Sequence, residues 1–307
     1  MELNLRLEMI SEIFLECNLE LSNNFVVRLE IENGVVPCYI KMATQDSLLY
    51  IETVQSESIK NLFETLREII VDCNLICDSE GMHILSMNPS ETTLVSLKLH
   101  AANFNVYHCA RKLTMGINIP SINKLFKRIE KSDILTLGVN VKNEHELSIH
   151  IDNPSKKQSS HLNYKLLDIP EDEVELPDAV GFQSIIRMPS GLFQKLCRNM
   201  KEIDGKIEIR SSGDNIIFRC KGDFADEETV VGQVSDGDVD GMMIVNKESD
   251  EVVRGMFSLK SLLQFTKATS LHSSVEIFLK NEYPMIIQYP VADLGELKFA
   301  LAPLSDE

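Results

Sequence analysis

A unit made of one amphipathic helix and one β-hairpin occurs four times along the chain, and this repeat limits the fold more than any other feature of the sequence. In the first copy, residues 58–70 place apolar side chains at the three- and four-residue spacing of a helix with one apolar face. Two strands are predicted next, at 74–77 and 82–87, with a turn at 78–81. The repeating order is therefore helix, strand, turn, strand.

The four helices begin near residues 57, 120, 189 and 258, which are 63, 69 and 69 residues apart. This spacing is too long for a solenoid repeat and suits half of a domain, so two pairs of units imply two similar domains of about 120 residues. Hairpins indicate antiparallel sheets, which cover the apolar helix faces. The predicted fold class is α+β, with two helices packed on antiparallel sheets in each domain. The other strand pairs are predicted at 134–139 with 146–151, 206–210 with 216–219, and 275–279 with 285–289.

The domain boundaries follow from the repeats and from a composition shift between them. Residues 167–178 contain two prolines and six acidic residues, which is typical of an extended surface linker. At the other end, the alternation of Leu3, Leu5, Leu7 and Met9 is compatible with a strand, and a disordered or alternatively initiated segment is favoured at least as much. We predict an N-terminal extension of uncertain structure at 1–47, a first domain at 48–164, a linker at 165–181, a second, similar domain at 182–303 and an acidic tail at 304–307.

Charge is segregated along the chain. The 307 residues carry a net charge of −17, which taken alone argues against a partner made of nucleic acid. Yet the helix segments 57–70, 120–131, 189–202 and 258–269 carry +6, and the rest of the chain carries −23. A basic stripe on one helix is usually just its solvated face, but a repeat can bring four such stripes onto one surface. A surface rich in Lys, without interleaved aromatic residues, suits sequence-independent contact with phosphates. The stripe consists of Lys60, Arg67, Lys124, Lys127, Arg128, Lys131, Lys195, Arg198, Lys201, Lys260 and Lys267.

The sequence offers no pattern for catalysis, a metal or a cofactor. It has no phosphate-binding loop, no nucleophile elbow and no HExxH, and its seven cysteines form no CxxC pair, which favours free thiols. The acidic run 236–241 resembles the start of a calcium loop, but Lys247 stands where a bidentate Glu is needed. No apolar stretch is long enough to span a bilayer and no secretory signal is present, so we expect an intracellular protein with no membrane partner.

Several motifs resemble those of the eukaryotic and viral sliding clamps, the proliferating cell nuclear antigen family. They occur in the family's order and spacing, from Leu48 to the C-terminus, and together they are specific. The motifs are 78–81 continuing to 85–87, 111–118, 188–191, 263–269, and 292–298 with 301–303.

The resemblance implies a non-enzymatic DNA clamp with the processivity fold. Three copies would join head to tail in a ring, with helices lining a hole around duplex DNA. Such a ring raises the processivity of a DNA polymerase and is a docking platform for replication and repair proteins, including those of mismatch repair. A separate clamp loader would open it. The implied location is the nucleus, or a viral replication compartment in the cytoplasm.

The resemblance also assigns residues to roles. The positions that would face DNA are Lys60, Arg67, Lys124, Lys127, Lys195, Arg198 and Lys267. The positions that would form a pocket for a partner's clamp-binding peptide are Met87, Leu94, Val174, Leu176, Pro177, Pro284, Ala302 and Pro303. Subunit contacts are expected through edge strands at 146–151 and 227–234.

Three positions depart from the family pattern. Glu91 replaces a common His and Ala300 replaces a common aromatic residue, so we expect altered peptide preferences. Gly213 stands where well-studied members carry a Lys that is modified by ubiquitin, so we expect no such modification there. Two alternatives stay open: a clamp-like interaction or checkpoint protein that does not trimerise, and a metal-dependent enzyme that uses the acidic loops.

Overall fold

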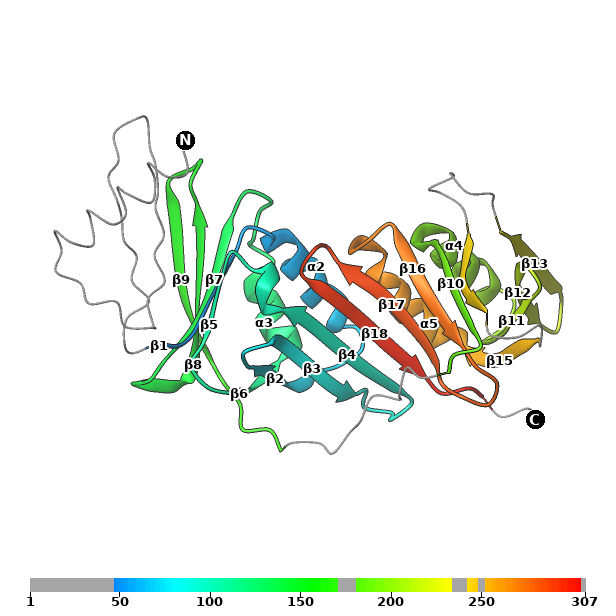
Figure 1. Ribbon diagram of the computed structural model, residues 1–307, viewed down its shortest axis with the longest axis horizontal. Helices are drawn as coiled ribbons and strands as arrows, with labels where there is room; N and C mark the ends of the chain where they lie inside the picture. The colour runs from blue at the N-terminus through cyan, green and yellow to red at the C-terminus, as the bar shows by residue number, and fades with distance from the viewer. Residues whose placement is uncertain (1–46, 171–180, 234–241, 248–251, 305–307) are drawn as a thin grey trace. The chain divides into compact units, whose positions relative to one another are not determined.

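The structure is a computed structural model that describes residues 47–170, 181–233, 242–247 and 252–304 (Figure 1). The chain divides into two units, 1–47 and 48–307, and the elements below belong to the second from Leu48 onward. Val174, Leu176, Pro177 and the acidic run 236–241 lie outside the described residues.

The repeating unit is larger than the predicted helix and hairpin, because a strand precedes each helix and three strands follow it. The first copy is β1 (Ser47–Thr53), α2 (Ser56–Leu66), β2 (Asp72–Cys77), β3 (Gly81–Met87) and β4 (Thr93–His100). The second is β6 (Leu113–Asn118), α3 (Ile119–Phe126), β7 (Ile134–Asn140), β8 (Asn143–Asn153) and β9 (Gln158–Lys165). The third is β10 (Ser184–Pro189), α4 (Ser190–Lys201), β11 (Lys206–Ser212), β12 (Asn215–Lys221) and β13 (Asp226–Gly232). The fourth is β15 (Val253–Ser258), α5 (Leu259–Phe265) with the 3-10 turn η2 (Thr266–Ser270), β16 (Ser274–Leu279), β17 (Met285–Val291) and β18 (Gly295–Leu301). All four predicted hairpins are confirmed.

The copies exchange their first strands in pairs. β1 pairs with β7 of the second copy, and β6 of the second copy pairs with β2 of the first. The third and fourth copies make the same exchange, with β10 on β16 and β15 on β11. Each exchange ties two copies into one half of the molecule, and two short strands, β5 (Val106–Cys109) and β14 (Met243–Lys247), extend the sheets.

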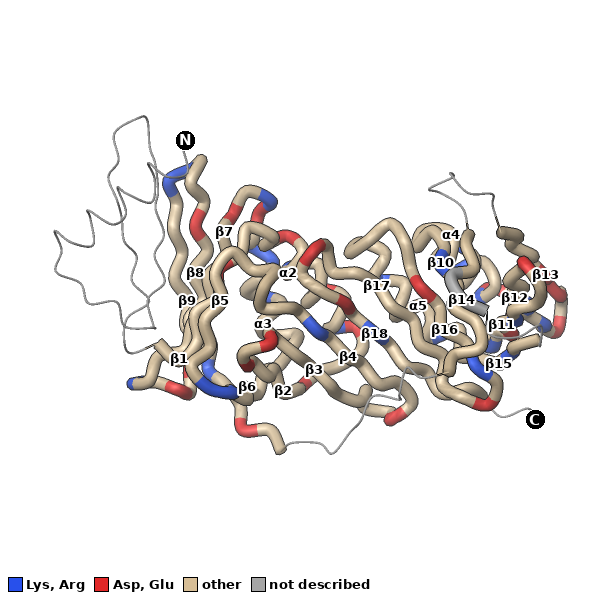
Figure 2. The backbone as a smooth tube through the Cα atoms, in the orientation of Figure 1, with Lys and Arg blue, Asp and Glu red and all other residues tan. Residues whose placement is uncertain are grey.

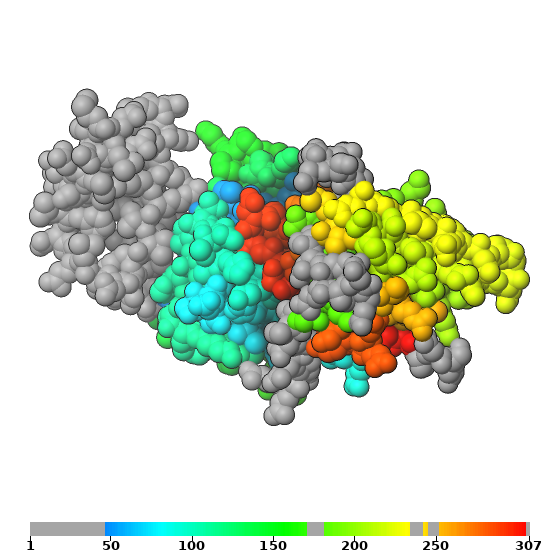
Figure 3. Space-filling model, turned by 45° about the vertical axis from the view of Figure 1, so that its right-hand side comes forward, coloured from blue at the N-terminus to red at the C-terminus, as the bar shows by residue number. Residues whose placement is uncertain are grey.

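One sheet runs through both halves. β18, near the C-terminus, pairs antiparallel with β4, from Leu301 opposite Thr93 to Gly295 opposite Leu99. The result is a nine-stranded sheet in the order β14-β10-β16-β17-β18-β4-β3-β2-β6, beside a five-stranded sheet, β5-β1-β7-β8-β9, and a four-stranded sheet, β13-β12-β11-β15. Figure 3 shows the red segment around β18 directly against the cyan N-terminal half.

The apolar helix faces pack on the sheets, as the periodicity predicted. Phe63 of α2 and Phe126 of α3 meet edge to face with ring centroids 4.9 Å apart. In the other half, Phe265 at the end of α5 stacks on Phe299 of β18 at 4.6 Å. All four rings are at most 2% exposed, so burial of the apolar faces is the main force that seats the helices.

The helices end earlier than the apolar periodicity suggested. α2 stops at Leu66 and α3 at Phe126, and each is followed by a tight turn, such as the bond from the Ile129 amide to the Phe126 carbonyl at 3.0 Å. Such i→i+3 bonds keep apolar residues facing the core for one more turn, which is why the pattern overran the helix. Arg128 and Lys131 therefore lie after α3, and Lys267 lies in η2.

One predicted edge strand is wrong. The segment 146–151 belongs to β8, which is paired with β7 on one side and with β9 on the other. The edge of that sheet is β9, which the sequence analysis did not predict because only Leu162 and Tyr164 give it an inward apolar pattern. The other predicted edge is confirmed where it is described, since β13 is the terminal strand of the four-stranded sheet.

Candidate nucleic-acid interface

The four helices form one layer across both halves of the described chain. α2 packs against α3 and η2, and α4 packs against α5 and η2. The side chain of Gln264 in α5 donates a hydrogen bond to the Glu68 carbonyl after α2 at 2.9 Å, which joins the halves at this layer. Figure 1 shows the helices together behind the nine-stranded sheet.

Five of the seven predicted DNA-facing residues are exposed on this layer. The apolar sides of the helices are buried on the sheets, so the exposed cations lie on the side that the sheets do not cover. Figure 2 shows Lys and Arg as blue segments along the helices. The exposed members are Lys124, Lys127, Lys195, Arg198 and Lys267.

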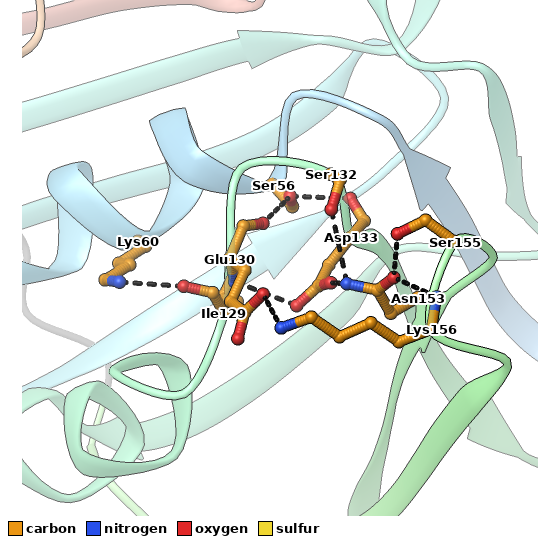
Figure 4. A network of polar contacts seen from close by, with 9 residues as sticks. All are labelled: Ser56, Lys60, Ile129, Glu130, Ser132, Asp133, Asn153, Ser155 and Lys156. Carbon is orange, nitrogen blue, oxygen red and sulfur yellow. Dashed lines mark hydrogen bonds and ion pairs between the residues drawn. The ribbon is translucent and has the colours of Figure 1, made fainter.

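The remaining two predicted residues are half-buried and already paired. The Lys60 ammonium donates to the Ile129 carbonyl at 2.7 Å, just beyond the C-terminal end of α3, as Figure 4 shows. A cation is favoured there by the partial negative charge of the helix end. Arg67 Nε lies 3.2 Å from a carboxylate oxygen of Glu68, and its Nη2 lies 3.9 Å from Glu64. Both cations therefore contribute less free positive charge than the sequence implied.

A network of polar contacts fixes the segment that follows α3. The buried carboxylate of Asp133 accepts hydrogen bonds from the Glu130 amide at 2.8 Å and from the Asn153 side chain at 2.6 Å. Its backbone carbonyl accepts from the Ser56 hydroxyl at 2.7 Å, which brings in the start of α2 (Figure 4). The Asn153 side-chain oxygen accepts from the amide of Lys156 at 2.9 Å. The end of α3, the start of α2 and the β8–β9 turn are thus held together.

This network supports a basic pocket of about 490 Å³ between the end of α3 and the start of β9. Lys124, Lys127, Arg128 and Lys156 line it, and the Lys156 ammonium is ion-paired with the Glu130 carboxylate. Lys156 is a residue that sequence reasoning missed as part of the basic surface. It lies in a turn of the chain, and only the fold brings that turn beside α3.

Two members of the predicted peptide pocket meet on the other face of the nine-stranded sheet. Leu94 of β4 is buried, and Met87 of β3 packs against the small apolar cluster to which Leu94 belongs. The cluster is separate from the main core and also contains Phe182, Ile286 and Ala300. It spans strands of both halves, and this is where the resemblance placed a partner's peptide.

The other described residues of the predicted pocket, Pro284, Ala302 and Pro303, are not members of that cluster. Pro284 is half-buried just before β17, and Ala302 and Pro303 are exposed just after β18. The Ala302 amide lies 3.5 Å from the Thr92 carbonyl, beside the β3–β4 turn. Ala302 and Pro303 line a pocket of about 560 Å³ that also borders the ends of α2 and α5.

The cluster contains aromatic residues that sequence reasoning missed. Phe182 packs edge to face on Phe278 at 5.5 Å and on Tyr283 at 5.9 Å. The sequence does contain a signal for this second cluster, namely pairs of adjacent apolar residues within strands, such as Ile185 with Ile186 and Leu94 with Val95. Adjacent residues of a strand point to opposite faces, so a strand with such a pair is apolar on both faces and covers a second surface besides the core.

The described residues contain little that points to catalysis. The five described cysteines are unpaired, and burial raises the pKa of the Cys73 and Cys197 thiols to about 12, far from nucleophilic thiolates. In the same part of the chain, no group of three or more His, Cys, Asp or Glu side chains is placed so that it could hold a metal ion. No helix among these residues is long and apolar enough to cross a membrane.

Comparison with known proteins gives matches over most of the chain. The models of the proliferating cell nuclear antigen N-terminal and C-terminal domains match residues 48–175 and 175–304. A protein of Paramecium bursaria Chlorella virus 1, described as probable DNA polymerase sliding clamp 1, is 34% identical over 267 residues. These residues cover 86% of this chain and 99% of the viral protein.

Proposed function

The chain belongs to the proliferating cell nuclear antigen family of DNA sliding clamps, and from this premise we propose that three copies close into a ring around duplex DNA. The ring acts as a DNA polymerase processivity factor. The family is non-catalytic, and we propose that this chain likewise binds partners and catalyses no reaction.

The observation that carries the proposal is the helix layer with its exposed cations. Lys124, Lys127, Lys195, Arg198 and Lys267 lie on one layer of a chain whose net charge is −17. Lys and Arg attract phosphates without reading bases, and the acidic remainder repels DNA from other surfaces. Duplex DNA is therefore favoured along the helices alone.

The mechanism combines enclosure with weak attraction. A closed ring stays linked to DNA without tight contacts, and non-specific phosphate contacts permit sliding along the duplex. Strong base-specific contacts would stop that movement. A separate clamp loader opens the ring at a subunit contact.

Two edge strands support head-to-tail closure. β9 presents Lys165 and His161 at one edge, whereas β13 begins with Asp226, Glu227 and Glu228 at the edge of another sheet. Pairing β13 of one copy with β9 of the next satisfies the open backbone groups of both edges and brings opposite charges together. Because the two surfaces differ, the contact is heterologous and generates a ring when its rotation closes.

The apolar cluster around Leu94 is the proposed docking place for partner peptides. Such a peptide places its apolar plug on the cluster, and its backbone can pair with the linker as an added strand. DNA polymerase, the clamp loader and other replication and repair proteins are the proposed partners. Ala300 contributes only a methyl group, so the pocket has room for a larger plug than one with an aromatic residue there.

The test of the helix layer reverses two charges. Lys124→Glu with Lys127→Glu should reduce stimulation of a polymerase on primed DNA at least tenfold, because four units of charge change at the proposed DNA surface. The matched control is Lys112→Glu with Lys142→Glu, an equal charge change at exposed loops of the same half. Unchanged stimulation by the first variant, with its oligomeric state intact, would sink the proposed role of the layer.

A clamp-like protein that does not trimerise is the second candidate function, since an edge strand can instead accept a different protein. Gel filtration with light scattering separates the two, because a monomer across micromolar concentrations contradicts the ring. For location we propose the nucleus, or a viral replication compartment in the cytoplasm. Fluorescence microscopy of the tagged chain, with a marker of DNA synthesis, distinguishes the two locations.

A further inference from the structure

Two histidine rings are in contact, tilted against each other, on the five-stranded sheet. His150 of β8 and His161 of β9 are direct cross-strand neighbours, and their Nδ1 atoms lie 3.3 Å apart. The ring centroids are 4.1 Å apart, with the planes inclined at 44°. The pair lies on the face opposite Leu147 and Ile149, which are buried in the core.

The separation of the two nitrogens matches a chelate. Two imidazole nitrogens bound to one zinc ion at about 2.0–2.1 Å, with a tetrahedral angle between them, lie about 3.3–3.4 Å apart. We propose that His150 and His161 bind one divalent transition-metal ion, with Zn²⁺ as the probe. In the metal-free pair, one Nδ1–H donates to the other Nδ1. Metal binding requires both protons on Nε2 and a turn of the two rings, because the centroids of two imidazoles bound at a tetrahedral angle lie about 5 Å apart and here they are 4.1 Å apart.

The neighbouring side chains suit a cation. The adjacent cross-strand pairs are Ser148 with Asn163 and Asp152 with Ser159, so neither adds a positive charge. Asp152 lies on the same face of β8 as His150 and adds negative charge. Because no third ligand completes a cluster among the described residues, water fills the remaining positions. Two imidazoles select Zn²⁺, Cu²⁺ or Ni²⁺ over Mg²⁺ or Ca²⁺, which prefer oxygen ligands.

A metal ion bound by both histidines would link the edge strand β9 to its neighbour β8. β9 has a paired strand on one side only, so a bridge between His150 and His161 restrains the strand that a neighbouring copy would join. The metal site itself does not depend on the proposed ring. It can be tested on the chain in any oligomeric state.

The test is calorimetric titration of the full untagged chain with Zn²⁺, beside the variants His150→Gln and His161→Gln. We expect the wild-type chain to bind one equivalent more than either variant, and its thermal midpoint to rise by several degrees with Zn²⁺. His145→Gln is the matched control, because His145 is an exposed histidine near the start of the same strand. This control should bind like the wild type.

Equal Zn²⁺ stoichiometry in the wild type and in both pair variants overturns the proposal, as does loss of binding in His145→Gln. A second measurement needs no variant. Histidine acylation mapped by mass spectrometry should be slowed by Zn²⁺ at His161 and left unchanged at His145. Equal rates at His161 with and without Zn²⁺ would also overturn the site.

Discussion

At the scale of single residues, the side chain of Asp133 holds the most consequential polar contacts of the described chain. It is 4% exposed and accepts hydrogen bonds from Glu130 and Asn153, while its carbonyl receives the hydroxyl of Ser56. A buried carboxylate is tolerated only where such donors surround it. These contacts also hold Lys156 beside α3. Asp133 is too buried to touch DNA, but in this way it shapes the basic pocket.

We predict that Asp133→Ala lowers the free energy of unfolding by about 2–4 kcal/mol, since the part-buried Glu130 amide and the buried Asn153 side chain lose the carboxylate that accepts from both. Urea unfolding followed by circular dichroism measures this. Glu130→Gln breaks only the exposed ion pair with Lys156 and should cost less than about 1 kcal/mol. Equal losses in the two variants would contradict the importance of the buried network.

The buried thiols predict how stability depends on pH. Burial raises the pKa of Cys73 and Cys197 from the ordinary thiol value of 9.0 to about 12, and raises that of Cys77 as well. The unfolded chain therefore ionises first as pH rises, and the stability present below about pH 9 is lost progressively toward pH 12. The loss is at most about 1.4 kcal/mol per thiol for each pH unit. Urea unfolding between pH 8 and pH 10.5 should show it, with a shallower slope for Cys197→Ala.

At the scale of elements, β13 is exposed on one face and along its free edge, and half-buried on the other face. Val230 is 54% exposed, and Phe224 in the preceding turn is 76% exposed. A strand with this much accessible apolar surface invites pairing unless another chain covers it. Figure 2 shows acidic residues along the same strand, which restricts the partner to a surface of opposite charge.

We predict that Val230→Glu weakens self-association at least tenfold, about 1.4 kcal/mol, because it buries a charge in the proposed subunit contact. Light scattering across a dilution series gives the mass and the midpoint of dissociation. Val141→Glu is the control, since Val141 is 49% exposed at the β7–β8 turn, away from β13. Identical masses for wild type and Val230→Glu at every concentration would exclude this strand from the contact.

At the scale of the whole molecule, strand exchange and the shared nine-stranded sheet make both halves one cooperative body. β18 pairs with β4 along its length, and Gln264 joins the helix layer at the same boundary. A hinge motion between the halves would break these hydrogen bonds, so it has a high free-energy cost. Opening of a ring is therefore expected at the contacts between copies rather than within a copy.

A ring that encloses DNA should be retained by topology rather than by affinity. We predict that the clamp, once loaded on nicked circular DNA, stays bound at salt concentrations that abolish phosphate contacts, and that it is lost when the circle is cut. Gel filtration of the DNA fraction before and after linearisation measures retention. Equal retention on circular and linear DNA would show that attraction, and not enclosure, holds the protein.

Local sequence patterns predicted the elements well, because a helix face or a hairpin is specified by neighbours within a few residues. Apolar spacing predicted the four helices, and apolar runs together with turn residues predicted their hairpins. The exchange of β1 and β6 was not predicted, since which strands pair across long separations depends on which faces and edges meet after the chain is packed. β9 was not predicted for a related reason. An edge strand pairs with a neighbour along one edge only, and few apolar residues are enough to hold it in the sheet.

The amino-acid sequence by itself determined the sign and the helical placement of the charge, as well as the absence of recognisable catalytic motifs. Only the tertiary structure decided that Lys60 is engaged, since the Ile129 carbonyl that accepts from it lies 69 residues further along the chain, whereas Arg67 is paired with its sequence neighbours Glu64 and Glu68. It also brought Lys156 to the end of α3 and His161 beside His150. The physical reason is the same in each case: charge and spacing are properties of a segment, whereas a partner is supplied by whatever the fold places next to it.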